Sequence, residues 1–294
     1  MILMERLGAA DAQGGSMPFR PPILAGTFYS ADPAQLAGSV DSHLKAGEEA
    51  ARAGGHEAVP ASMAVLPHAG HVYCGRVIGE TLARIRLPDR LIIVCPSHTG
   101  KGAPLSVWPE GEWGTPLGGV SVDAALARDL IATDAGYTAD TRAHTGEHSI
   151  EVLLPFIQRA MPGVRIVPVV VATHPDGLQA AGQGLASVLR KASADGSPAG
   201  LIVSSDLHHY GNEPVTRAQD EVALNLLVAR DPVALYNTVV GRHISMCGIQ
   251  PAALALFAGR ELGWNRVELV AHTTSAEASG DTSRVVGYAG LFAV

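Results

Sequence analysis

Histidines closely follow three short apolar runs of this sequence. His68 comes after the run 63–66, His98 after the run 91–95, and His209 after the run 201–204. Such runs are typical of strands buried on both faces, and the carboxyl ends of parallel strands meet along one edge of a sheet. A single histidine after a strand is more often a hydrogen-bonded structural residue. Three such turns instead predict imidazoles that converge on one metal ion.

Cys247 is a fourth candidate for this chemistry. It lies ahead of a helix that we predict to begin near Pro251. A thiolate is stabilised near a helix N-terminus or by a metal, so Cys247 could be a ligand, although a small buried apolar residue is an equally good interpretation. Cys95, within an apolar run, is predicted to be inert.

Acidic residues accompany two of the histidines. Asp206 shares a turn with His209 and could orient its imidazole and raise its basicity, as a general base requires; a plain Asx turn is the alternative. Glu147 and His148 stand at a predicted helix start. They could contact substrate or surround the metal ligands, or Glu147 could simply favour the helix dipole.

Strand-like runs alternate with helical segments throughout the chain. We predict strands at 63–66, 91–95, 166–171, 201–204, 267–271 and 285–292, and helices at 32–45, 76–85, 123–132, 149–161, 177–190, 213–229 and 251–262. This alternation indicates a single-domain α/β sandwich with a mostly parallel central sheet. The Gly- and Pro-rich segment 99–116, with two tryptophans, either covers the site or forms a surface β-excursion.

Composition excludes several classes of protein. The chain has 294 residues with a formal net charge of −7 and no basic stripe, so we expect no nucleic-acid partner. No apolar stretch reaches the roughly 20 residues of a membrane span. Three cysteines without a C-x-x-C pair indicate a reducing compartment, and we see no secretory signal, so we expect a cytoplasmic protein. There is also no P-loop lysine, nucleophile elbow or H-E-x-x-H motif.

The order of these motifs resembles the Memo family, also called protein B of the AmmeMemoRadiSam system. The resemblance runs from about Phe19 to Val294 and rests on many short segments in the same order. They are Ala25-Gly26-Thr27-Phe28-Tyr29, Pro67-His68-Ala69-Gly70, Pro96-Ser97-His98, Thr115-Pro116-Leu117-Gly118, Glu147-His148-Ser149-Ile150-Glu151, Leu154-Pro155-Phe156, Ser204-Ser205-Asp206, His209-Tyr210-Gly211 and Cys247-Gly248.

The resemblance implies a fold similar to class III extradiol dioxygenases, which hold non-haem iron. It implies His68, His98 and Cys247 as metal ligands, with His209 and Asp206 as catalytic residues. A thiolate in place of the dioxygenase carboxylate favours iron, copper or zinc, so ring cleavage does not simply carry over. We expect Fe(II), with Cu or Zn as competitors.

This chain departs from the usual family pattern at His71, Cys74 and His208, where extra ligands or altered redox behaviour could arise. We expect Tyr73 and His208, together with Glu147 and His148, to contact substrate or surround the ligands.

These observations lead to one function and two alternatives. The first is redox or oxygen-dependent chemistry on a small molecule or a modified peptide, with AMMECR-like and radical SAM proteins as partners. The alternatives are a non-enzymatic peptide- or metal-binding module that uses the same cleft, and a zinc-dependent hydrolase. We expect residues 1–16 to form a disordered extension and residues 17–294 to form one Memo-like domain.

Overall fold

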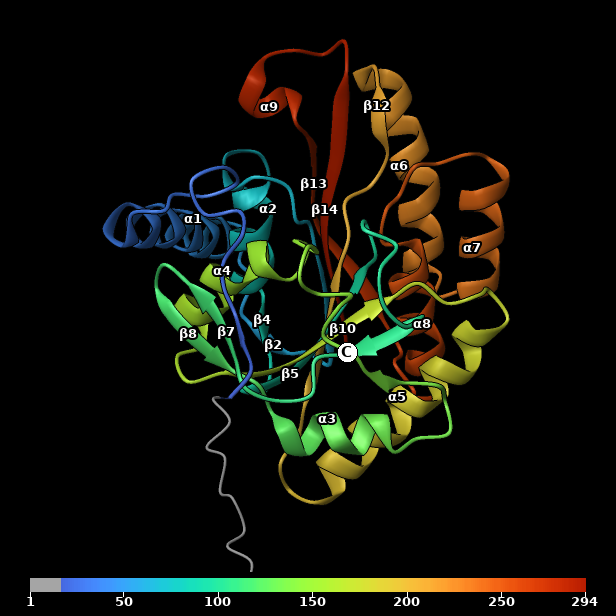
Figure 1. The fold of residues 1–294 in the computed structure, drawn as a ribbon. Helices are drawn as coiled ribbons and strands as arrows, with labels where there is room; N and C mark the ends of the chain where they lie inside the picture. Colours follow the sequence, from blue (N-terminus) through green and yellow to red (C-terminus); the bar gives the residue numbers. More distant parts are fainter. Residues whose placement is uncertain (1–16) are drawn as a thin grey trace, which may run out of the picture.

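The computed structural model describes residues 17–294, as one α/β fold (Figure 1). The extension expected over residues 1–16 lies outside the described residues. The strands are β1 (Phe19–Arg20), β2 (Val59–Pro60), β3 (Met63–Leu66), β4 (Ile85–Arg86), β5 (Arg90–Pro96), β6 (Leu105–Val107), β7 (Glu112–Thr115), β8 (Gly118–Ser121), β9 (Thr138–Ala139), β10 (Arg165–Val171), β11 (Gly200–Ser204), β12 (His209–Gly211), β13 (Val267–Thr274) and β14 (Val285–Ala293).

The helices fall between these strands. They are α1 (Pro33–Ala53), α2 (His71–Ala83), α3 (Ala124–Ile131), a short 3-10 helix η1 (Glu151–Leu153), α4 (Leu154–Ala160), α5 (Gly177–Ala194), α6 (Glu213–Val228), α7 (Pro232–Gly241), α8 (Ile249–Leu262) and α9 (Ala276–Ser279). Within residues 17–294, no helix is both long and apolar enough to cross a bilayer.

The main sheet is parallel at its centre, with an antiparallel strand on either side of this central group. In the described chain it has nine strands, in the order β12-β14-β3-β11-β5-β10-β6-β9, with β13 paired to β14. Strands β3, β11, β5 and β10 pair in parallel. Strands β14 and β6, which flank this group, run antiparallel to it. The α/β sandwich is therefore confirmed, and the sheet is mixed.

Both faces of the sheet are covered by helices. Alternate strand residues such as Val65 and Val94 face one core, formed with α3, α5, α6, α7 and α8. Their neighbours Leu66 and Cys95 face the other core, formed with α1, α2 and α4. Figure 1 shows α6, α7 and α8 on the right, α3 and α5 toward the bottom, and α1, α2 and α4 on the left. The period-two division explains why the strand sequences are continuously apolar.

The segment 99–116 forms a β-excursion. It contains β6 and β7, and β7 pairs with β1 and β8 in a separate small sheet. Trp108 and Trp113 are buried and pack edge-on against each other and against His144. No residue of this segment is among those that line the cavity described below, so of its two interpretations the structural one agrees with the structure.

Candidate metal centre

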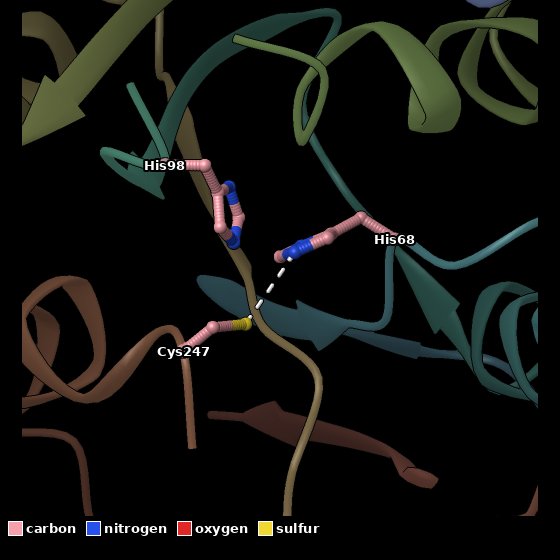
Figure 2. Close-up of side chains that lie close together, drawn as sticks. All are labelled: His68, His98 and Cys247. Carbon is pink, nitrogen blue, oxygen red and sulfur yellow. Dashed lines mark hydrogen bonds between the residues drawn. The ribbon is translucent and has the colours of Figure 1, made fainter. Parts of the chain in front are cut away.

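Two strand ends and one helix start bring the three candidate ligands together. His68 follows β3, His98 follows β5 and Cys247 lies just before α8. Their donor atoms all lie within 4.8 Å of one another (Figure 2). The Nε2 atom of His68 is 3.4 Å from the sulfur of Cys247. The three groups line one cavity of about 700 Å³.

Hydrogen bonds fix which nitrogen of His68 is free. Its Nδ1 is 2.8 Å from the hydroxyl oxygen of Ser204, the last residue of β11. That hydroxyl donates its own proton to the backbone carbonyl of Ser149, at 2.7 Å. Ser204 must therefore accept from Nδ1–H, because its only proton is already used. The lone pair of His68 then lies on Nε2, which faces Cys247.

Glu147 fixes His98 in the same way. The buried carboxylate lies 3.0 Å from Nδ1 of His98 and accepts the backbone N–H of the same residue at 2.6 Å. The carboxylate needs a proton from the ring, which places the lone pair of His98 on Nε2. Burial alone would raise the pKa of Glu147, but the hydrogen bonds from His98 and Ser149 lower that pKa well below its usual range. The same contact raises the pKa of His98.

A second cluster, of His98, Glu147 and His148, has donor atoms equally close together. In this cluster the carboxylate has no room for a metal. Besides His98, Glu147 accepts the backbone N–H groups of His148 and Ser149 and the hydroxyl of Ser149. Five donors exceed the roughly four lone-pair sites of a carboxylate. Glu147 therefore orients its neighbours, and the set of His68, His98 and Cys247 fits a metal better.

The environment of Cys247 determines the pKa of its thiol and hence whether the sulfur is charged. Desolvation and then the nearby Asp206 raise its pKa. The backbone N–H of Asp206 points at the sulfur, at 3.3 Å, and α8 begins two residues later. We expected that helix start to stabilise a thiolate, but desolvation outweighs it. A bound cation would supply the missing stabilisation.

Asp206 was expected to orient the imidazole of His209, but the two side chains have other hydrogen-bond partners. The buried carboxylate of Asp206 accepts the backbone N–H of His68 at 2.8 Å, which holds the turn that carries that ligand. Burial raises the pKa of Asp206. The ring of His209 is instead oriented by Ser245, whose carbonyl lies 2.7 Å from Nδ1. A carbonyl only accepts, so Nδ1 carries the proton and Nε2 is free to act as a base.

The remaining predicted site residues divide into two groups. Tyr73 and His148 line the cavity with His209 and Asp206. His208 does not line it: its backbone N–H donates to the buried carboxylate of Asp220, and its Nδ1 accepts from the backbone of Ser245. The structure thus gives His208 a role in the turn and no contact with the cavity.

His71 and Cys74, two departures from the family pattern, are buried in α2. His71 donates from Nε2 to the carbonyl of Val152, and its ring stacks on Tyr29 at 5.2 Å. Cys74 donates to the carbonyl of Ala69, and burial raises the pKa of its thiol. Neither belongs to a ligand cluster in the described chain.

A buried ion pair fastens the Glu147 segment to the N-terminal strand. Arg20 lies 2.6 Å from Glu151, and both side chains are almost fully buried. Arg20 also donates to the carbonyls of His144 and Glu147. Glu151 in turn accepts from Tyr29 and from two backbone N–H groups. This network holds the segment that orients His98.

Sequence reasoning missed three serines of this site. Ser204, Ser149 and Ser245 provide the contacts that orient His68 and His209. A signal existed for Ser204, since it is a hydroxyl residue that ends an otherwise apolar strand. The contacts of Ser149 and Ser245 span 55 and 36 residues of sequence, so their partners cannot be read from the local sequence, although Ser149 lies within one of the quoted motifs.

The fold and this cluster together define an α/β protein with a histidine–cysteine site at the carboxyl edge of its sheet. Comparison with known proteins specifies the family. The profile of Memo-like proteins matches residues 20–292. The chain is 34% identical to a MEMO1 family protein of Methanothermobacter thermautotrophicus, covering 92% of this chain and 99% of that protein.

Two bacterial relatives are similar to this chain to the same extent. A MEMO1 family protein of Thermotoga neapolitana is 35% identical, over 92% of this chain and 97% of its own length. One from Aquifex aeolicus is 34% identical, over 94% and 99%. The chain therefore belongs to the Memo family, as its motifs predicted.

Proposed function

We propose that this protein binds one transition metal through His68, His98 and Cys247 and uses it for redox or oxygen-dependent chemistry on a small molecule or a modified peptide. The observation that carries the proposal is the orientation of the ligands. Ser204 and Glu147 hold the two imidazoles with the lone pair on Nε2, and the donor atoms of His68, His98 and Cys247 lie within 4.8 Å of one another (Figure 2). Such an arrangement leaves three lone pairs converging in a cavity that is large enough to admit a ligand.

The donor set favours soft or borderline metals. Two imidazoles and a thiolate suit iron, copper or zinc, whereas magnesium and calcium prefer oxygen ligands. Among these we propose Fe(II), with copper as a competitor. When bound, such an ion would supply one-electron chemistry and Lewis acidity at its open positions.

The residues around the ligands would position substrate and move protons. His209 lines the cavity, and because its Nδ1 donates to Ser245, the neutral ring would have its lone pair on Nε2 and would accept a proton from a bound substrate. Asp206 holds the His68 turn in place. Phe28, Val286 and Tyr288 form apolar walls that would exclude water from the reacting end of the substrate.

Anaerobic purification followed by metal analysis tests the ligand set. We expect one metal ion per chain in the parent protein and less than a tenth of that in His68→Ala, His98→Ala or Cys247→Ala. His174→Ala is a matched control, because this exposed histidine is outside the cluster. Metal retention in the triple variant of the three ligands would contradict the proposal.

Stopped-flow mixing of the anaerobic Fe(II) protein with O₂ tests the chemistry. We expect a spectral change and oxygen uptake, with oxidation of Cys247 detectable by mass spectrometry. A metal-loaded protein that never consumes oxygen would instead favour the binding module.

Zinc-dependent hydrolysis is the second candidate, because the same three ligands with a free imidazole nearby are also a zinc-type arrangement. Ester or amide cleavage by the zinc-loaded protein, lost in His209→Ala, would support it. We also propose AMMECR-like and radical SAM proteins as partners, and co-purification of tagged pairs tests this.

A further inference from the structure

The cavity changes in character from its floor to its rim. The floor carries the ligands together with Asp206, His148 and His209, whereas the walls are apolar and largely aromatic. In the described chain, no lysine or arginine is among the residues that line the cavity. The apolar part of a ligand would therefore lie against the walls. An anionic group on the ligand would need a cationic side chain that lies beyond the residues lining the cavity.

Strand β14 leads from that floor to one such cation. Val286 and Tyr288 both line the cavity, and residues two apart on a strand point to the same side. Arg284 lies in the bend directly before the strand and contacts Tyr210, another residue that lines the cavity. Exposure rises toward this bend: Tyr288 is 2% exposed, Val286 is half-buried and Arg284 is exposed. At about 3.4 Å per residue, the backbone from Tyr288 to Arg284 spans at most about 14 Å.

A β-bulge brings an aromatic ring to the same rim. The pairing of β12 with β14 shifts register between His209 and Gly211, so Tyr210 is the extra residue. It has a φ of 67° and a side chain that is 65% exposed while still lining the cavity. Bulges next to functional sites commonly re-aim a side chain in this way, and the left-handed backbone is costly for a residue with a Cβ.

Arg284 stacks on this ring. Its guanidinium carbon lies 4.4 Å from the ring centroid of Tyr210. Within residues 17–294 it makes neither an ion pair nor a side-chain hydrogen bond, unlike Arg76 and Arg217 nearby in the fold. Stacking restricts the guanidinium while its N–H groups stay free to bind an anion.

We propose that the cavity binds an aryl carboxylate, with the ring between the apolar walls and the carboxylate on Arg284. This proposal takes from the proposed function only that the cavity is the binding site, and it names the class of molecule that binds there. One guanidinium matches one negative charge and pairs with a planar carboxylate through two parallel hydrogen bonds. A dianionic phosphate would leave charge uncompensated here.

Acidic groups near the floor set the direction of the ligand. Asp206 lines the cavity beside His68, and the buried Glu147 lies behind His98. In the metal-free protein they disfavour an anion at the floor, so the carboxylate binds at the rim and the other end of the molecule points toward the ligands. A metal at the floor could itself attract a carboxylate, so the test uses metal-free protein.

The experiment measures binding of matched probes to the chelator-treated full chain by titration calorimetry or ligand-observed NMR. The probes are 3-phenylpropionate, its neutral amide and 3-phenylpropylphosphonate. We expect the carboxylate to bind about fivefold more tightly than the amide, an effect in the range of a partly exposed ion pair. The preference should shrink in high salt. The phosphonate should bind no more tightly than the carboxylate.

Two variants locate the effect. Arg284→Gln should weaken the carboxylate about fivefold and leave the amide unchanged, whereas Arg128→Gln, an exposed arginine on α3 at the opposite end of the fold, should change neither (Figure 1). Equal affinity for carboxylate and amide, tighter phosphonate binding, or a preference that survives Arg284→Gln would each overturn the proposal. Since no metal is used, these outcomes are independent of the metal and oxygen experiments.

Discussion

Replacing Glu147 by glutamine tests whether hydrogen bonds prepare the metal site. The isosteric amide can keep the contacts of Oε1, with the His98 ring, the backbone of His148 and Ser149. The Oε2 position would then hold an N–H group facing the backbone N–H of His98, which Oε2 now accepts at 2.6 Å. A buried donor left unpaired costs about 1–3 kcal/mol, and the negative charge beside the ring is lost as well.

Because this cost falls on the turn that carries a ligand, we expect the metal Kd of Glu147→Gln to rise about 10- to 100-fold, or about 1.4–2.7 kcal/mol. The assay is competition with a chromophoric chelator, with Co²⁺ as the probe because its thiolate charge-transfer band reports Cys247 directly. Circular dichroism confirms that the variant is folded, and Glu49→Gln, an exposed residue of α1, is the control. A folded Glu147→Gln protein with a Kd within threefold of the parent would refute the reasoning.

Three further predictions concern single residues. His209→Ala should keep its metal Kd within threefold and lose about 10²- to 10⁴-fold of any catalytic rate, and equal loss of metal would make His209 a ligand. Burial lowers the pKa of His144 to about 4, so the folded ring stays neutral while the unfolded chain gains a proton below about pH 6.5. This contribution to stability is complete above pH 6.5 and falls by about 3 kcal/mol as the pH drops toward 4, so His144→Gln should flatten the pH dependence of the free energy of unfolding in that window. Gly287→Ala would place a Cβ 1.9 Å from a carboxylate oxygen of Asp220 and should cost about 3 kcal/mol in urea unfolding, whereas Gly241→Ala, with open space around it, should cost nothing measurable.

The central strands could be predicted from the sequence almost to the residue. The runs 63–66 and 201–204 differ from β3 and β11 by at most one residue, because strands buried on both faces are continuously apolar. Helix α1 was predicted to end at 45 but continues to Ala53. Its glycine at 47 lowers helix propensity, yet there a Cβ would lie 2.3 Å from the carbonyl oxygen of Gly79. The glycine permits close packing of α1 on α2, which local sequence does not reveal.

Helix α7 was missed although its start signal was present. Asp231 caps it by accepting from Val233 and Ala234, and Pro232 occupies its first position. The small sheet of β1, β7 and β8 was also missed as a sheet, because its strands are only two to four residues long and β1 pairs with β7 across about 90 residues of sequence. Contacts of that separation are decided by the tertiary fold.

For the candidate site, the sequence predicts which donors gather but not what orients them. His68 and His98 follow parallel strands that pair with β11 on either side, so their convergence follows from the fold class. The third donor, Cys247, arrives from a different region and was placed through the family resemblance. The roles of Ser204 and Ser245 depend on hydroxyl and carbonyl positions that only the three-dimensional structure supplies.

The electrostatics of the site predict that metal binding and deprotonation of Cys247 would be coupled. Without a cation, desolvation and the proximity of Asp206 keep the thiol protonated, and burial also lowers the pKa of His68, which keeps its lone pair available. A divalent ion among these donors would offset the desolvation of the thiolate, so the thiol would lose its proton when the ion binds. Affinity for the metal would therefore rise with pH over the range in which the free thiol is protonated. The oriented imidazoles need no such change, because Ser204 and Glu147 already hold the tautomer that a metal requires.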